Sequence, residues 1–189
     1  SFPTRRSSDL GPLPDASTRV AVREDLGVTP ETFVVGTIAR LDPVKSLGTL
    51  IEAVSLLPNV PPVRVVVVGD GSERRSLEQH AESLGVQDRV TFLGHRNDAR
   101  RWLAGCDAYV NCSISEGVSL TILEAMAAGL PVVATRVGGT PEVVDETCGC
   151  LIPPRSAAEL SDALRELADS PERGVQRGRA ARKRVETLF

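Results

Sequence analysis

The sequence is poor in aromatic residues and histidine, and it lacks a long apolar run. Aromatic side chains make up 3% of its 189 residues, which disfavours a surface that stacks on nucleic-acid bases. No apolar run reaches the ~20 residues of a membrane-spanning helix, and the most apolar stretch, residues 63–68, is interrupted by Arg64. The first ten residues lack the apolar centre of a signal peptide. We therefore expect a globular protein that neither spans a membrane nor binds nucleic acid.

An excess of one charge and the spacings typical of metal sites are lacking too. The 22 Lys and Arg residues against 25 Asp and Glu give a formal net charge of −3, too close to neutral for a broadly basic surface. No C-x-x-C pair occurs, and with two histidines the zinc-site spacings are absent. We expect no metal, reduced cysteines in or near a core, and a cytoplasmic location. The cysteines are Cys106, Cys112, Cys148 and Cys150.

The chain divides into a short leader and one domain. Residues 1–10 mix Ser, Arg and Pro without periodicity and resemble a translated sequencing adapter. Residues 1–12 are therefore interpreted as a disordered or adapter-derived leader. Residues 13–189 are enough for one domain with a sizeable core. Their first segment is amphipathic, and Gly27 is expected to end it as a helix.

From residue 33 onward, strand and helix patterns alternate. Residues 33–39 are apolar and β-branched, residues 46–57 repeat apolar side chains at helical spacing, and residues 63–68 are too apolar to face water on either side. Alternation with short Gly- and Pro-rich loops predicts an α/β fold, a Rossmann-like parallel sheet with helices on both faces. Further strands are expected at 90–93, 108–112, 131–135 and 150–152, and further helices at 73–84, 98–104, 120–128, 141–144, 156–168 and 172–188.

Two features concern the last helices. Ser156 is expected to be an N-cap, with Glu159 at the capping-box position. The basic residues between 173 and 184 are expected to form a solvated helix face, with a membrane surface or an acidic partner as the weaker alternative.

Ligands of parallel sheets bind at the carboxyl ends of the strands, so the loops that follow strands are the candidate site. Arg40 and Lys45 lie five residues apart after the first strand. A guanidinium fork and a lysine charge beside a helix N-terminus could clamp a diphosphate. Their spacing alone leaves two solvated surface charges as the simpler interpretation.

Glycines mark the other loops. Gly69 and Gly71 follow the second strand, but Arg74 stands where a dinucleotide fingerprint requires a third Gly or Ala, which disfavours NAD or FAD. The third loop, residues 94–96, could border a base or ribose. The last glycine pair, residues 138–139, is expected to form a tight turn before a short helix.

Two glutamates make residues 115–127, SEGVSLTILEAMA, the most informative segment. Glu116 lies on a loop, and Glu124 lies in the next helix among apolar neighbours, where a carboxylate needs a partner. Ligand hydroxyls or a core hydrogen-bond network could supply it. The open N–H groups of residues 117–121 suit an anion. A glycoside hydrolase would use two carboxylates facing one bond, whereas this loop-and-helix pair is better arranged to contact separate parts of one long ligand.

Taken in order, five segments resemble the C-terminal domain of the retaining GT-B glycosyltransferases of family four, the glycosyl transferases group 1. They are GTIARLDPVKS, VVVVGDG, VTFLGHR, SEGVSLTILEAMAAGLPVVAT and VGGTPEVV, and the resemblance runs over residues 33–168. The Glu-x7-Glu pair is that family's hallmark. The resemblance implies the donor-binding half of a two-domain GT-B fold, inactive alone, with the acceptor site in an absent N-terminal domain. Any peripheral membrane contact would come through that absent half.

The resemblance also implies a role for each matched residue. Arg40 and Lys45 would hold the diphosphate of a UDP- or GDP-sugar, and Glu116 would contact the sugar hydroxyls. These three are the expected catalytic residues, with no protein nucleophile assigned and no metal or other cofactor needed. Glu124 would bind the ribose. The other expected substrate-binding residues are Gly71, Gly94, His95, Arg96, Gly117, Val118, Ser119, Leu120 and Thr121.

The sequence departs from the family at one position of the first loop. Ser46 stands where the family often has Gly, so the geometry of that loop is open. Two other functions also stay open. One is a standalone nucleotide-sugar-binding or regulatory module without catalysis, and the other is a sugar-nucleotide epimerase, which would need further acid and base groups.

Overall fold

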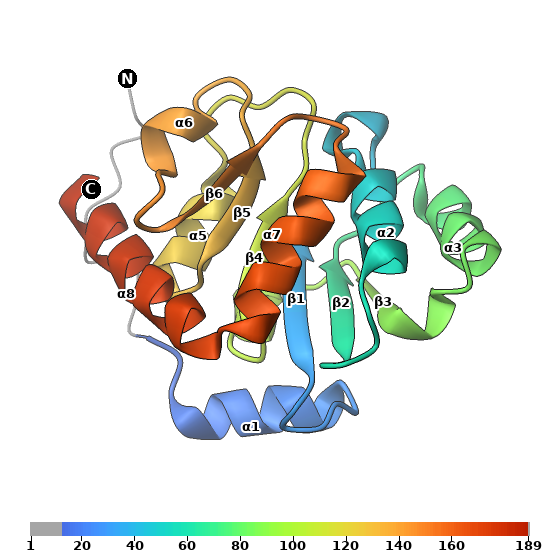
Figure 1. Cartoon of the computed structure of the whole chain (residues 1–189), viewed down its shortest axis with the longest axis horizontal. Helices are drawn as coiled ribbons and strands as arrows, with labels where there is room; N and C mark the ends of the chain where they lie inside the picture. The colour runs from blue at the N-terminus through green and yellow to red at the C-terminus, as the bar shows by residue number, and fades with distance from the viewer. Residues whose placement is uncertain (1–12, 189) are drawn as a thin grey trace.

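A computed structural model of the protein describes residues 13–188, so the prediction for residues 1–12 falls outside them. Within this part the chain forms a six-stranded parallel sheet in the order β3-β2-β1-β4-β5-β6 (Figure 1). The strands are β1 (Phe33–Ile38), β2 (Val63–Val68), β3 (Val90–Gly94), β4 (Ala108–Asn111), β5 (Val132–Thr135) and β6 (Gly149–Ile152). The larger helices are α1 (Ala16–Asp25), α2 (Leu47–Leu56), α3 (Arg74–Ser83), α5 (Leu120–Ala127), α7 (Ala157–Asp169) and α8 (Pro171–Leu188), and the short ones are α4 (Ala99–Leu103), α6 (Thr140–Val143), η2 (Pro43–Lys45) and η3 (Gln87–Arg89).

Both faces of the sheet are buried, as the apolar strand patterns predict. In β2, Val65 and Val67 belong to one core cluster, with residues of α2, α3 and α7. Val66 and Val68 belong to the other, with residues of α1, α4, α5 and α8. Alternate side chains of one strand thus point into separate cores, because successive residues face opposite sides of a sheet. The predicted α/β fold is confirmed, with element ends within one or two residues of the expected ones.

The strand order reverses at the centre of the sheet. The chain runs outward from β1 through β2 to β3, then returns to pair β4 with β1 before running outward to β6. The connections after β1 and β4 therefore pass to opposite faces of the sheet, and the carboxyl ends of these two strands mark the switch-point crevice of open α/β sheets. Such a switch point is where open α/β sheets bind ligands.

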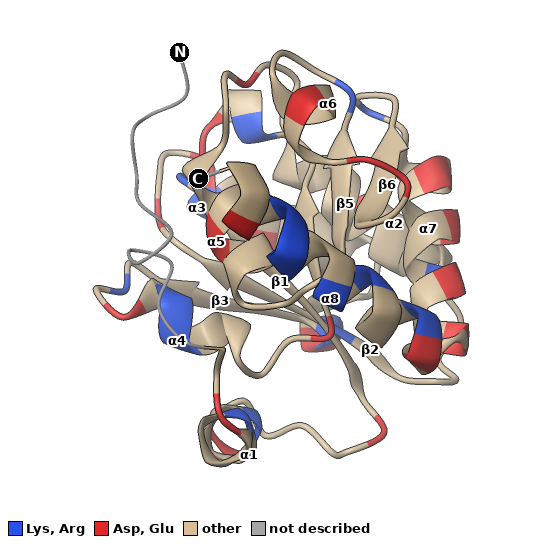
Figure 2. Cartoon of the chain, turned by 90° about the vertical axis from the view of Figure 1, so that its left-hand side faces the viewer, with Lys and Arg blue, Asp and Glu red and all other residues tan. Residues whose placement is uncertain are grey.

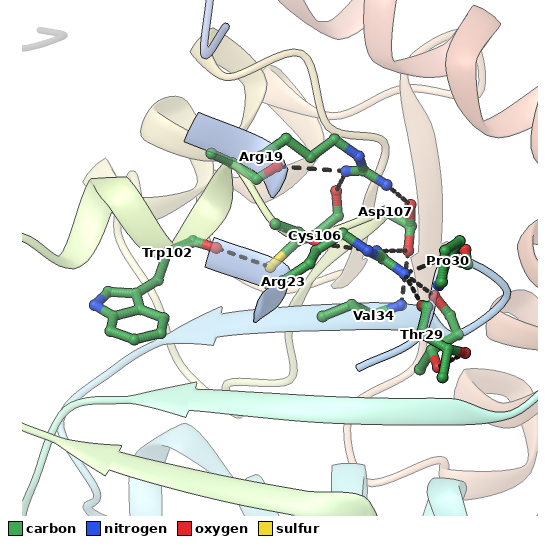
Figure 3. A network of polar contacts seen from close by, with 11 residues as sticks. Arg19, Arg23, Thr29, Pro30, Val34, Trp102, Cys106 and Asp107 are labelled. Carbon is green, nitrogen blue, oxygen red and sulfur yellow. Dashed lines mark hydrogen bonds and ion pairs between the residues drawn. The ribbon is translucent and has the colours of Figure 1, made fainter. Parts of the chain in front are cut away.

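Helix α1 is held to the amino ends of β1 and β4 by an arginine–aspartate network (Figure 3). Arg23 donates to the carbonyl oxygens of Thr32 at 2.6 Å and Gly105 at 3.1 Å, and to Asp107 Oδ2 at 3.2 Å. Asp107 also accepts from the Val34 N–H at 2.7 Å and from Arg19 at 2.5 Å. These bonds lie at the end of the sheet opposite the crevice, so the network supports the fold.

The basic run of α8 is only partly solvated. Figure 2 shows the basic residues distributed along α8 together with acidic ones. Arg182 donates to the Ala127 carbonyl at the end of α5, and Arg184 donates to the Val143 carbonyl of α6 at 2.6 Å. Both arginines satisfy carbonyls at the ends of other helices. The prediction of a solvated face is therefore wrong for these two residues, which fasten α8 to α5 and α6.

The start of α7 differs from the sequence prediction. Ser156 stands at the N-cap of α7, but its hydroxyl lies 3.5 Å from Glu159 Oε1 and caps no backbone N–H. The predicted capping box is therefore wrong.

The four cysteines are free, and all but Cys150 are buried, which confirms their expected packing. Between residues 13 and 188, none of the helices has the length and hydropathy that crossing a bilayer requires.

Candidate functional site at the β1–β4 crevice

The loops after β1 and β4 contact each other at the switch point. The Ile114 N–H donates to the Val44 carbonyl at 2.9 Å. The Cys112 thiol lies 3.3 Å from the carbonyl oxygens of both Lys45 and Ser46. Burial raises the pKa of this thiol to about 12, so it stays protonated and can act as the donor. The first and fourth predicted loops are thereby joined into one wall.

Lys45 and Glu116 meet across this junction. Lys45 Nζ lies 2.7 Å from Glu116 Oε2, with the side chains 24% and 14% exposed. The Ser113 hydroxyl donates to the same carboxylate oxygen at 2.9 Å. Lys45 is predicted to contact the diphosphate and Glu116 the sugar. The two side chains lie at hydrogen-bond distance although 71 positions separate them in the sequence.

Arg40 lies on the same loop, but its guanidinium faces solvent. Its side chain is 77% exposed and pairs with Asp42, two residues further on. The structure thus brings Lys45 and Glu116 together and leaves Arg40 outside their contact. The role predicted for Arg40 stays a prediction.

Ser46 explains why glycine suits this position. Its φ and ψ of 49° and 39° are left-handed, a region that glycine enters without the clash of a Cβ. This residue ends η2, which carries Lys45, and precedes α2. The Ser46 hydroxyl lies 3.0 Å from the Thr49 hydroxyl. The loop thus makes a left-handed turn at a serine.

Two glycines, which have no side chain, allow neighbouring loops to pack closely on these two loops. A Cβ on Gly71 would lie 2.5 Å from the Leu41 carbonyl oxygen, and one on Gly138 would lie 1.6 Å from that of Glu116. The Gly139 N–H also donates to the Gly117 carbonyl at 3.1 Å. The loops after β2 and β5 therefore pack directly on the loops that carry Lys45 and Glu116. We did not predict from the sequence that the glycine pair 138–139 contacts the loop of Glu116. Two adjacent glycines were the feature of the sequence that could have indicated so close a backbone contact.

The N-terminus of α5 opens at the crevice. Ser119 is the N-cap, but its hydroxyl accepts from Asn111 Nδ2 at 3.2 Å and lies 3.1 Å from the Thr121 hydroxyl. It makes no capping bond to the first-turn N–H groups. Gly117 is exposed, Val118 half-buried and Leu120 exposed. The N–H groups predicted to bind phosphate therefore belong to a helix start that its own N-cap side chain leaves uncapped.

Glu124 has the partner that its burial requires. Arg100 Nη2, on α4, lies 2.8 Å from Glu124 Oε1. The hydroxyl of Tyr109 lies nearby, donating to the Ile38 carbonyl at 3.2 Å. Burial, together with the Glu124 charge, raises the pKa of Tyr109. Sequence reasoning did not identify Arg100, because nothing in the local pattern of α4 distinguishes it from Arg101.

The loop after β3 lies beside the loop after β2. The Gly69 N–H donates to the Gly94 carbonyl at 2.8 Å. His95 and Arg96 are exposed, and the Arg96 guanidinium stacks 5.3 Å above the ring of Trp102. Their predicted contacts with a base are compatible with this exposure but stay predictions. Among residues 13–188 no group of three or more His, Cys, Asp or Glu side chains could hold a metal ion.

The sequence is similar to those of known proteins. Residues 19–184 match the family model described as "Glycosyl transferases group 1". The chain is 36% identical over 157 residues to D-inositol 3-phosphate glycosyltransferase from Mycobacteroides abscessus, covering 79% of this chain and 35% of that protein. It therefore spans about a third of this curated relative.

Two solved structures are similar over nearly the whole chain. HepE from Anabaena, crystallised in complex with UDP-glucose, has a TM-score of 0.90 and 31% identity over 98% of this chain and 51% of its own. The C-terminal domain of a glycosyl transferase group 1 family protein (LpcC) from Francisella tularensis has a TM-score of 0.82 and 26% identity, covering 97% of both chains. The expected fold, the Rossmann-like half of a GT-B enzyme, is confirmed by these likenesses.

Proposed function

Because the chain belongs to the glycosyl transferases group 1 family, we propose that it is the donor-binding half of a glycosyltransferase. It binds a nucleotide-diphosphate-sugar such as a UDP- or GDP-sugar, and the sugar is transferred with retention at the anomeric carbon. The observation that carries this proposal is the crevice between β1 and β4, where Lys45 Nζ lies 2.7 Å from Glu116 Oε2 beside the start of α5. The complex of HepE with UDP-glucose supports the donor class.

Different residues of this site contact different parts of the donor. The bond between the anomeric carbon and the diphosphate oxygen breaks during transfer, and negative charge develops on the leaving phosphate. Lys45, Arg40 and the N–H groups at the start of α5 stabilise that charge. Glu116, held by Ser113 at 2.9 Å, accepts hydrogen bonds from sugar hydroxyls, and Glu124 accepts them from the ribose. These groups supply the neutralisation, so we propose that the transfer proceeds without a metal.

We propose that the acceptor site belongs to a second, N-terminal domain and that the described domain does not catalyse transfer alone. The match to an isolated C-terminal domain over 97% of both chains supports this division. Peripheral membrane contact, where it occurs, belongs to the other domain. The proposed location is the cytoplasm, which the four free thiols support.

The experiment that tests this function is a calorimetric titration of the chain with UDP-, GDP- and ADP-sugars. Lys45→Ala is expected to lower the affinity for the donor that binds best by about 10-fold or more, because hydrogen bonds to charged groups contribute roughly 1.5–3 kcal/mol. Lys183→Ala is the matched control, since the sequence has two lysines and Lys183 is exposed on α8. Equal donor affinity in the wild type and the Lys45 variant would refute the assignment, as would the absence of binding by the wild type.

A further inference from the structure

Two adjacent arginines of α4 pair with residues of different helices. Arg100 Nη2 lies 2.8 Å from Glu124 Oε1 on α5, whereas Arg101 Nη2 lies 2.7 Å from Asp25 Oδ2 on α1. In Figure 2 the basic part of α4 lies on the same side of the sheet as α5, in agreement with the shared core cluster of the two helices. Arg100 thus contacts a residue of the candidate site, whereas Arg101 contacts α1, the helix held at the amino ends of β1 and β4.

The two acidic partners differ in their exposure to water. The Glu124 side chain is 20% exposed, whereas that of Asp25 is 51% exposed. A charge pair with a partly buried member is screened less than one in open solvent. Arg100 itself is 51% exposed, so its contact orients the Glu124 carboxylate through one hydrogen bond and contributes little to the stability of the fold.

The carboxylate held in this way can still accept other hydrogen bonds. A carboxylate offers about four lone-pair sites on its two oxygens, and Arg100 Nη2 donates to Oε1. Glu124 also lies one turn after Leu120 and Thr121, on the face of α5 that continues from its open N-terminus. A phosphate at the helix start and a ribose at Glu124 are therefore reached along one helix face.

From this geometry we infer that Arg100 is a positioning residue for ribose recognition, an inference that rests on the proposed function. Arg100 holds the Glu124 carboxylate in the orientation that accepts hydrogen bonds from the ribose diol. The pair therefore determines the preference of the site for ribonucleotides over 2′-deoxyribonucleotides. Without Arg100 the carboxylate turns among several rotamers, and the site loses part of that preference.

The test measures the ratio of the dissociation constants of 2′-deoxy-UDP and UDP, with the GDP pair in parallel. The wild type is expected to prefer the ribonucleotide by about 10-fold, since one hydrogen bond to a charged group is lost. Arg100→Ala is expected to lower this ratio to about 3-fold or less, and Arg100→Lys to restore part of it. Arg101→Ala is the matched control, because it removes the neighbouring ion pair and should keep the wild-type ratio.

The ratio separates positioning from stability, because both nucleotides bind the same folded fraction of each variant. A ratio in Arg100→Ala equal to that of the wild type would overturn the inference while leaving the proposed function intact. A wild-type ratio near one would also overturn it. Failure of the wild type to bind any nucleoside diphosphate would instead refute the proposed function. Should Arg100→Ala fail to fold, Arg100→Gln keeps the side-chain length and is expected to show the same reduced ratio.

Discussion

The left-handed backbone at Ser46 gives a stability prediction with a definite sign. Its φ of 49° and ψ of 39° cost a residue with a Cβ roughly 1–2 kcal/mol, and glycine avoids this cost. Glycine also loses about 0.5–1 kcal/mol through the greater freedom of the unfolded chain. Both Ser46→Gly and Ser46→Ala remove the hydroxyl that contacts Thr49. The difference between their free energies of unfolding therefore reports the backbone alone. We expect the glycine variant to be more stable than the alanine variant by about 0.5–1 kcal/mol.

Helix α2 itself provides the control. Glu52 lies in its interior and is exposed, and at such a position alanine is favoured over glycine by about 1 kcal/mol. Glu52→Gly should therefore be less stable than Glu52→Ala, the reverse of the order at residue 46. Urea unfolding of the four variants measures both differences, and thermal melting should show shifts of about 2–4 °C per kcal/mol for a domain of this size. The same order at both positions, with alanine the more stable, would show that residue 46 carries no backbone strain.

Two further predictions concern the core. Asp107→Ala leaves Arg23, whose side chain is 11% exposed, without its carboxylate and should lower the free energy of unfolding by about 3 kcal/mol. A loss under about 1 kcal/mol in urea unfolding would contradict the importance of the network in Figure 3. Burial raises the pKa of the Cys106 and Cys112 thiols from 9.0 to about 12. Because the thiols of the unfolded chain lose their protons at a lower pH than those of the folded chain, the free energy of unfolding should fall as pH rises above 9. The double variant with both thiols changed to alanine should show a shallower loss between pH 9 and 11, and an unchanged slope would exclude the thiols as its source.

Local pattern was sufficient for the fold class and for the family. Apolar β-branched runs such as β2, and the helical spacing of α2, depend on residues near one another in the chain, so periodicity reveals them. Parallel connections then restrict the topology to a sheet covered on both faces. The position of Lys45 and Glu116 on loops that follow strands was predictable for the same reason. The roles of the individual site residues stay predictions.

Only the tertiary structure decided which of these loops meet and which charges pair. The return of the chain from β3 to the β1 edge places Lys45 beside Glu116, and no local pattern encodes that strand order. Arg100, Arg182 and Arg184 all lie on helices where a solvated arginine has the same sequence signature as one that reaches a neighbouring element. A long flexible side chain takes its partner from the packing of whole helices, and that packing is determined by contacts far apart in the sequence.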